Sequence, residues 1–65
     1  MQDFALVDHG SIAMLTPRTK AAREWIANNL PDDAPRMGNG VAIEPRYVLP
    51  ILDGIDAEGL TFIQY

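Results

Sequence analysis

Side chains suited to catalysis are few in this chain, and they lie far apart. His9 is the single histidine and follows Asp8, so the pair could serve as a general base and its orienting carboxylate, with Asp3 as the other acid nearby in sequence. A catalytic centre or a metal site needs several such groups in one place. We therefore interpret His9 as a solvated turn residue, and we expect no catalytic residue, no metal ligand and no cofactor.

Two short segments have the composition of ligand-binding loops but lack the required pattern. Asp32 and Asp33 offer carboxylates to a hard cation, yet Ca²⁺ takes roughly six to eight oxygen ligands and no loop pattern here supplies them. Gly38-Asn39-Gly40 precedes a predicted strand, whereas a phosphate-binding loop follows a strand and opens a helix. We expect Gly38-Asn39-Gly40 to form a tight turn.

All five cations lie between Arg18 and Arg46, and Arg18, Lys20 and Arg23 fall on or beside the first predicted helix. They could form a face that binds an anion or nucleic acid. The alternative is a solvated helix surface, because Lys20 and Glu24 are four residues apart and can pair along a helix. The net charge of −4 disfavours general binding to nucleic acid, which relies on neutralising phosphates.

The composition indicates one folded domain, residues 1–65, close to the lower size limit. With 48% apolar and 22% charged residues, the chain is typical of a globular protein. It has no cysteine, so disulfides cannot supplement a core that hides only about 60% of the unfolded surface. The first residues lack the features of a signal peptide, and no apolar run approaches the ~20 residues of a membrane span. We expect a cytoplasmic protein without membrane contact.

The elements that position these residues begin with two apolar runs, Phe4–Asp8 and Ser11–Leu15. They predict a β-hairpin in which Gly10 takes a positive φ and Asp8 accepts a hydrogen bond from the turn backbone. Both faces of these strands are apolar, so either the hairpin is covered on two sides or one face awaits a partner.

The segment Thr16–Leu30 predicts the first helix. Thr16 suits the N-cap, Pro17 suits the first helical position, and Pro31 ends the run. An apolar stripe follows the helical spacing and consists of Ala22, Trp25, Ile26 and Leu30. Because Trp25 is central in this stripe, we expect it in the core rather than at an exposed interface.

The second half of the chain predicts a loop, a strand, a helix and a last strand. Pro31–Gly40 has loop composition, and a loop of this length often contacts other molecules. Val41–Glu44 is the third strand, the spacing of apolar residues predicts a helix over Arg46–Glu58, and Leu60–Tyr65 is the fourth strand.

Three residues affect where the second helix begins, how stable it is and where it ends. Pro50 fits only if the helix proper begins near Tyr47 or its first turn is irregular. Gly54 weakens the helix by roughly 1 kcal/mol relative to alanine, and a close approach of another backbone would explain it. Gly59 suits a left-handed residue that ends the helix.

The predicted order is ββαβαβ. It indicates an α+β fold with two layers, in which a mixed four-stranded sheet has both helices packed on one face. The short links around the second helix favour a right-handed crossover between parallel third and fourth strands.

A series of short sequences also forms a recognisable pattern: His9-Gly10-Ser11-Ile12, Leu15-Thr16-Pro17, Thr19, Ala22, Trp25, Leu30-Pro31, Val41 through Val48, and Gly59-Leu60. Over nearly its whole length the chain resembles short uncharacterised proteins encoded in proteobacterial, phage and plasmid genomes. The resemblance implies an accessory protein that acts on a larger host component. No activity or site is established for that group, so the resemblance assigns no functional residue.

These observations predict a small non-catalytic accessory or interaction protein that self-associates as a homodimer and binds a host protein. One alternative is anion or nucleic-acid binding by the basic helix face, or a phosphate-like surface formed by Asp53, Asp56 and Glu58. The other is a small enzyme with a site at an oligomer interface, where neighbouring chains contribute His9 and Asp8. We expect interactions to involve Arg18, Lys20, Arg23, Arg36, Met37, Tyr47 and Tyr65.

Overall fold

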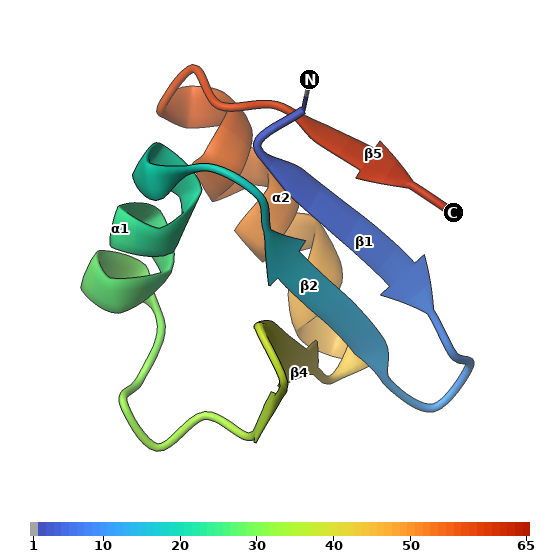
Figure 1. Ribbon diagram of the computed structural model, residues 1–65. Coiled ribbons are helices and arrows are strands. Elements are labelled where there is room, and N and C mark those ends of the chain that lie inside the picture. The colour runs from blue at the N-terminus through green and yellow to red at the C-terminus, as the bar shows by residue number, and fades with distance from the viewer. Residues whose placement is uncertain (1) are drawn as a thin grey trace.

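The chain folds into a mixed five-stranded sheet with two helices, as the computed structural model of residues 2–65 shows (Figure 1). The helices are α1 (Lys20–Asn29) and α2 (Val48–Ala57), and a short 3₁₀-helix, η1 (Pro45–Tyr47), leads into α2. The strands are β1 (Phe4–Asp8), β2 (Ala13–Pro17), β3 (Arg36–Met37), β4 (Gly40–Ile43) and β5 (Phe62–Gln64). In the sheet they stand in the order β3-β4-β2-β1-β5.

The α+β class, the mixed sheet and the two helices are therefore confirmed, whereas the four strands in the order ββαβαβ are wrong. The additional strand is β3, inside the segment predicted to be a loop, so the observed order is ββαββαβ. Met37 pairs with Gly40, which leaves Gly38 and Asn39 as a two-residue hairpin turn. Gly38 has a φ of 62°, so the predicted tight turn is confirmed.

The hairpin of β1 and β2 is confirmed, with one shift in its second strand. Gly10 has a φ of 87°, and its N–H donates a 2.7 Å hydrogen bond to Asp8 Oδ1. The second strand begins at Ala13 instead of Ser11 and runs on to Pro17, because its pairing with β1 continues to the Phe4–Pro17 pair.

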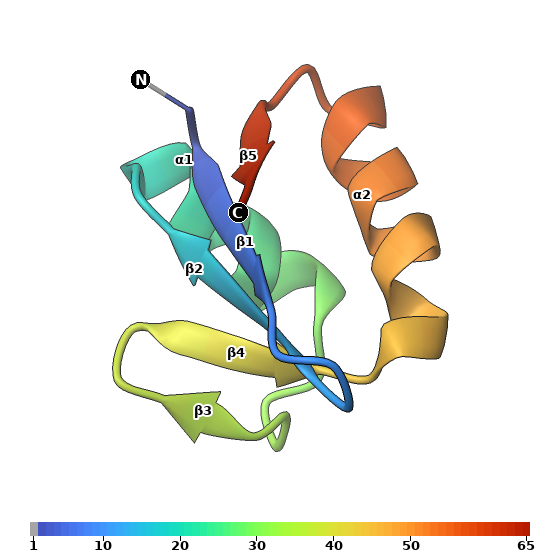
Figure 2. The same cartoon turned by 90° about the vertical axis from the view of Figure 1, so that its right-hand side faces the viewer.

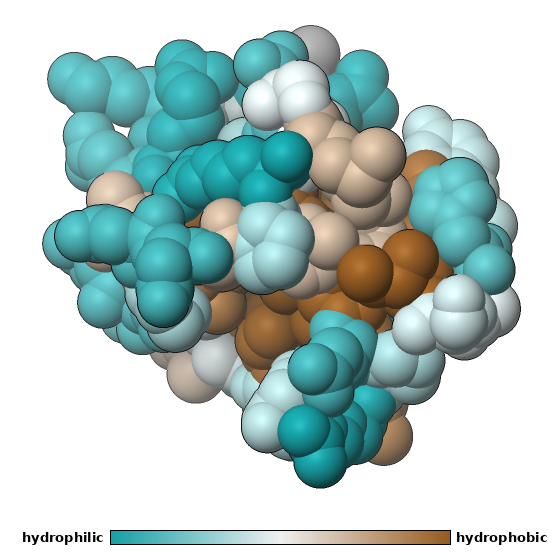
Figure 3. Space-filling model, turned by 90° about the horizontal axis from the view of Figure 1, so that it is seen from below, coloured by the Kyte–Doolittle hydropathy of each residue, from teal (hydrophilic) through white to brown (hydrophobic). Residues whose placement is uncertain are grey.

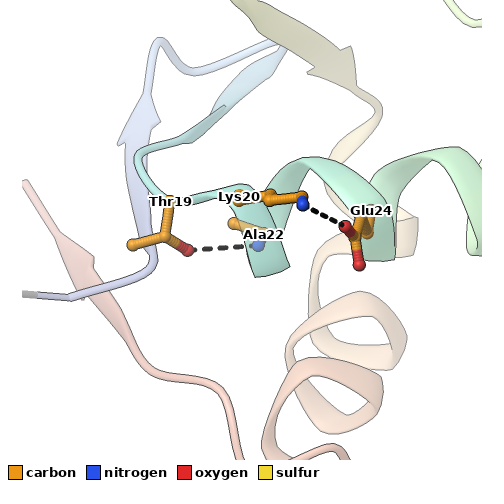
Figure 4. A network of polar contacts seen from close by, with 4 residues as sticks. All are labelled: Thr19, Lys20, Ala22 and Glu24. Atoms are coloured by element: carbon orange, nitrogen blue, oxygen red, sulfur yellow. Dashed lines mark hydrogen bonds and ion pairs between the residues drawn. The ribbon is translucent and has the colours of Figure 1, made fainter.

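The start of the first helix was predicted wrongly. Thr16 and Pro17 belong to β2, and α1 begins at Lys20 with Thr19 as its N-cap. The Ala22 N–H donates to the Thr19 hydroxyl oxygen at 3.1 Å (Figure 4). Both threonines satisfy the capping preference, and pairing of Thr16 with Ala5 in the sheet decides between them.

The second helix follows the prediction more closely. The η1 segment covers Pro45–Tyr47, so the α-helix starts at Val48 and Pro50 is its third residue. A proline in the first turn removes no intrahelical hydrogen bond, since the first N–H groups of a helix have no partner within it. Gly59 has a φ of 75°, as expected after the helix end.

The last strand, β5, pairs with β1, and the predicted parallel direction of the strands before and after the second helix is confirmed. β4 runs in the same direction as β5, but β2 and β1 stand between them (Figure 2). One edge of β1 is occupied by β2, and β5 adds to the free edge in parallel, with Phe62 opposite Phe4. The connection through α2 therefore spans two strands of the sheet.

Asp3 holds the start of this parallel pair and the start of α1 together. Its carboxylate accepts hydrogen bonds from the Thr19 hydroxyl at 2.7 Å and from the Thr61 N–H at 3.0 Å. These hydrogen bonds, from the Thr19 side chain first and then from the Thr61 backbone, lower the pKa of Asp3 below its ordinary value of 3.8.

The core lies between the sheet and the two helices, which share one face of the sheet. Trp25 is 7% exposed, as predicted, and its ring meets that of Phe4 edge to face at a centroid distance of 5.8 Å. Gly54 lies against the Trp25 ring rather than against a backbone, which corrects the expected reason for this glycine. The fully or nearly fully buried core residues are Phe4, Leu6, Ala13, Leu15, Ala22, Trp25, Ile26, Val41, Ile43, Leu52 and Ile55.

Candidate interaction surfaces

The five basic residues are divided among four environments. Lys20 Nζ lies 4.0 Å from Glu24 Oε2 on the exposed side of α1, so its charge is partly neutralised (Figure 4). Arg46 Nε donates to Glu44 Oε2 at 2.9 Å, and its guanidinium lies 4.9 Å from the centre of the Tyr47 ring. Neither cation joins the others in a common site.

Arg18 is exposed and lies in the link between β2 and α1. Its backbone N–H donates to the Asp3 carbonyl oxygen at 2.7 Å, which fixes the direction in which the chain enters the helix. The structure therefore gives the backbone of Arg18 a structural role and leaves its side chain at the surface.

Arg23 and Arg36 are brought together although 13 positions separate them in sequence. Both line a hollow of about 280 Å³ between α1 and the β3–β4 hairpin, and its wall is completed by Pro17, Ile26, Gly38 and Asn39. We call this the arginine hollow. The register of β3 with β4 explains why both arginines line the same hollow. Arg36 pairs with Val41, a core residue, so Arg36 lies on the face of the sheet that carries α1.

The other face of the sheet carries no charged side chain in any strand. Residues directly opposite one another share a face, and the registers place on this side Ala5, Val7, Met14, Thr16, Met37, Gly40, Ala42 and Ile63. We call this set the open sheet face. A sheet with one face in water normally alternates apolar with polar residues, so the absence of charge here departs from the usual pattern.

Side chains on the open sheet face pack against one another. A Cβ on Gly40 would lie 2.7 Å from Met14 Cε, which shows that the Met14 side chain extends over Gly40. Ala42 is 9% exposed, while Met37 at the edge of the face is 66% exposed. The middle of the face is therefore covered by its own side chains, and its edge at β3 exposes the apolar side chain of Met37.

A groove of about 570 Å³ opens at the end of the molecule shown in Figure 3, where hydrophobic atoms gather among hydrophilic ones. It lies between the loop after α1, the strand β4 and the start of α2, and Asp33 and Glu44 contribute its acidic groups. Tyr47, 49% exposed, lines this groove. The rest of its lining is Ile12, Leu30, Pro31, Ala34, Pro35, Ala42, Ile43, Pro50 and Ile51.

Tyr65 lies apart from the groove and from the arginine hollow. It follows β5 and is 70% exposed, and its N–H donates to the Leu6 carbonyl oxygen at 2.9 Å. The seven residues predicted for interaction thus fall on several surfaces, and two of them, Arg23 and Arg36, line the arginine hollow together.

The residues considered for catalysis do not converge. Asp3 and His9 lie at opposite ends of β1, and Asp8 accepts from the Gly10 N–H within the turn. In the described part of the chain, no three His, Cys, Asp or Glu side chains come close enough together to hold a metal ion.

Sequence reasoning missed Asn39 in the arginine hollow and Met14, Ala42 and Ile63 on the open sheet face. Their alternation along the strands was visible, but the missing strand β3 and the unknown strand order concealed which residues share a surface. Only the registers supply that information.

Comparison with known proteins gives no match: no family model, no curated protein and no solved structure matches this chain. The resemblance to short proteobacterial, phage and plasmid proteins therefore stays a prediction. Within residues 2–65, neither helix combines the length and the apolar character needed to cross a bilayer.

Proposed function

We propose that the protein is a small non-catalytic interaction module that self-associates through its open sheet face. The observation that supports this most is the absence of charge on that face, across all five strands. The position of His9 supports the non-catalytic part, because its neighbour Asp8 hydrogen-bonds to the turn backbone.

A second copy is the occupant that the lack of charge on the face favours. Two sheets pack face to face by interdigitating uncharged side chains, and a twofold axis brings the same patch of each copy together. A host protein as partner depends on the sequence resemblance alone, so the homodimer is the arrangement that we propose.

The area of the face sets the expected strength of the dimer. Neighbouring strands are ~4.8 Å apart, so five strands give a face about 19 Å wide. Each residue adds ~3.3 Å along a strand, so the longest strands are about 16 Å long, and the projected area of the face is about 300 Å². Two such faces remove about 600 Å² from water before side-chain relief is counted, which is below the ~1,000 Å² of stable interfaces. We therefore expect a weak dimer, with a Kd in the micromolar range or above.

Charge repulsion gives this dimer a characteristic salt dependence. Each copy carries a net charge of −4, so two copies repel one another while their contacting faces are apolar. Added salt screens the repulsion and leaves the apolar contact in place. Association should therefore strengthen as salt rises.

Sedimentation velocity over protein concentrations from about 10 μM to 1 mM tests the proposal. Val7→Lys places a positive charge on the open sheet face, and the twofold axis brings the same charge of the second copy close to it. This variant should weaken the dimer about tenfold or more. Ile63→Lys makes the same change in an edge strand, where folding tolerates it better. Circular dichroism verifies that each variant is folded.

Leu49→Lys is the matched control, because Leu49 is 72% exposed on α2, away from the open sheet face. This variant should dimerise like the unmodified chain. A chain that stays monomeric up to about 1 mM would overturn the proposal, as would equal weakening by Leu49→Lys and Ile63→Lys.

A further inference from the structure

The arginine hollow has the properties of a site for an anion. The two arginines in its lining come from elements that are distant in sequence, Arg23 from α1 and Arg36 from β3. The hairpin turn adds Asn39, whose side-chain amide is a neutral donor. Pro17 and Ile26 form an apolar part of the wall.

The charges of Arg23 and Arg36 are not neutralised by the protein. Among residues 2–65 the ion pairs are Lys20 with Glu24 and Arg46 with Glu44, so neither arginine of the hollow has a carboxylate partner. The chain has nine acidic residues, yet none of them lines the hollow. Arginine does not deprotonate in proteins, so both side chains stay charged, and an anion in the hollow would be attracted by both.

The geometry points to a phosphate group, and we propose that the arginine hollow binds phosphate through Arg23, Arg36 and Asn39. A carboxylate has two coplanar oxygens, which a single guanidinium fork satisfies. A phosphate group presents oxygens in several directions, so two guanidinium groups on different elements can contact it at the same time.

The size of the hollow limits the ligand to a small one. Its volume of about 280 Å³ lies just below the range of small-molecule sites, which span ~300–1,000 Å³. The hollow thus admits the phosphate and a small organic group against Pro17 and Ile26. The phosphate could belong to the free ion or to an organic monoester, and the chemistry that recognises it is shared.

Isothermal titration of the whole chain with inorganic phosphate, phenyl phosphate and acetate at low salt tests the site. Both phosphates should bind at least about tenfold more tightly than acetate. Tighter binding of phenyl phosphate than of the inorganic ion would identify a monoester as the ligand, because only the ester has a ring to place on Pro17 and Ile26. Equal binding would identify the free ion.

Variants separate this site from general attraction between charges. Arg23→Gln and Arg36→Gln should each weaken phosphate binding about tenfold or more. Arg36→Lys keeps the charge but loses the fork, so its affinity should fall between those of the Gln variant and the unmodified chain. All three changes are at exposed positions, where folding does not depend on the side chain.

Arg18→Gln is the matched control, since it removes the same charge outside the hollow. It should leave phosphate affinity within about twofold. Equal weakening by Arg18→Gln and Arg23→Gln would overturn the proposal, because the attraction would then depend on overall charge. Acetate binding as tight as phosphate, or no phosphate binding at low salt, would overturn it as well.

Discussion

Gly54 in α2 lies against the ring of Trp25, and replacing it with alanine sets two effects of opposite sign against each other. Alanine in a helix interior is more favourable than glycine by about 1 kcal/mol. The new Cβ, however, would lie 3.1 Å from Trp25 Cζ2 and 3.8 Å from Cη2. The 3.1 Å distance requires the ring to move by a few tenths of an ångström.

Trp25 has little freedom to move. It is 7% exposed and is held edge to face against Phe4, which is fully buried. Inserting a methyl group into a packed core costs about 1–3 kcal/mol. The packing cost therefore exceeds the helix gain, and Gly54→Ala should lower the free energy of unfolding by about 1 kcal/mol, or Tm by about 5 °C.

Urea unfolding followed by circular dichroism measures this change, and a second variant isolates its cause. Trp25→Phe removes the part of the indole that contains Cζ2. In the Trp25→Phe background, Gly54→Ala should therefore become stabilising by up to about 1 kcal/mol. If Gly54→Ala alone raises stability by about that amount, the Trp25 ring has room to move and the packing argument is wrong.

The remaining predictions concern the helix cap, the Asp3 carboxylate and the core. Thr19→Ala should cost about 1 kcal/mol in urea unfolding, because it removes the cap of α1. Lys20→Ala should change stability by less than about 0.5 kcal/mol, since its ion pair is exposed. Asp3 has a lowered pKa, so its ionised form stabilises the fold above the ordinary value of 3.8 and loses this effect as pH falls through the lowered pKa. Asp3→Asn should therefore lower Tm at neutral pH in scanning calorimetry, and its difference from the unmodified chain should shrink below about pH 4; a constant difference would contradict this. Leu15→Ala should cost about 2–5 kcal/mol, which is enough to unfold a domain of this size, and a folded variant of near-normal stability would disprove the placement of Leu15 in the core.

The local elements of this fold could be predicted from sequence because each has a short-range signal. Gly10, Gly59 and the turn at Gly38-Asn39 were predicted from residue preferences, and the structure confirms them. Trp25 was predicted as a core residue from helical spacing alone. In each of these cases the signal itself, a turn residue or the apolar spacing along one helix, is contained within a short segment of the sequence.

The remaining features depend on contacts between distant residues. Thr16 and Thr19 satisfy the same capping preference, and the pairing of β2 with β1 chooses Thr19. The strand β3 has two exposed residues, too few for a periodic pattern. The arginine hollow requires β3 and its register with Val41, so the meeting of Arg23 with Arg36 could not be derived from their positions in sequence.

The parallel pairing of β1 with β5 has a consequence for the order in which the domain forms. Asp3 and Thr61 are 58 positions apart, so their hydrogen bonds close a loop that contains almost all the other elements. Closing so long a loop is entropically costly and slows folding relative to the local β1–β2 hairpin. During synthesis, the edge of β1 that pairs with β5 stays uncovered until residue 64 has left the ribosome. Over that interval the nascent chain exposes an unpaired strand edge to other polypeptide chains.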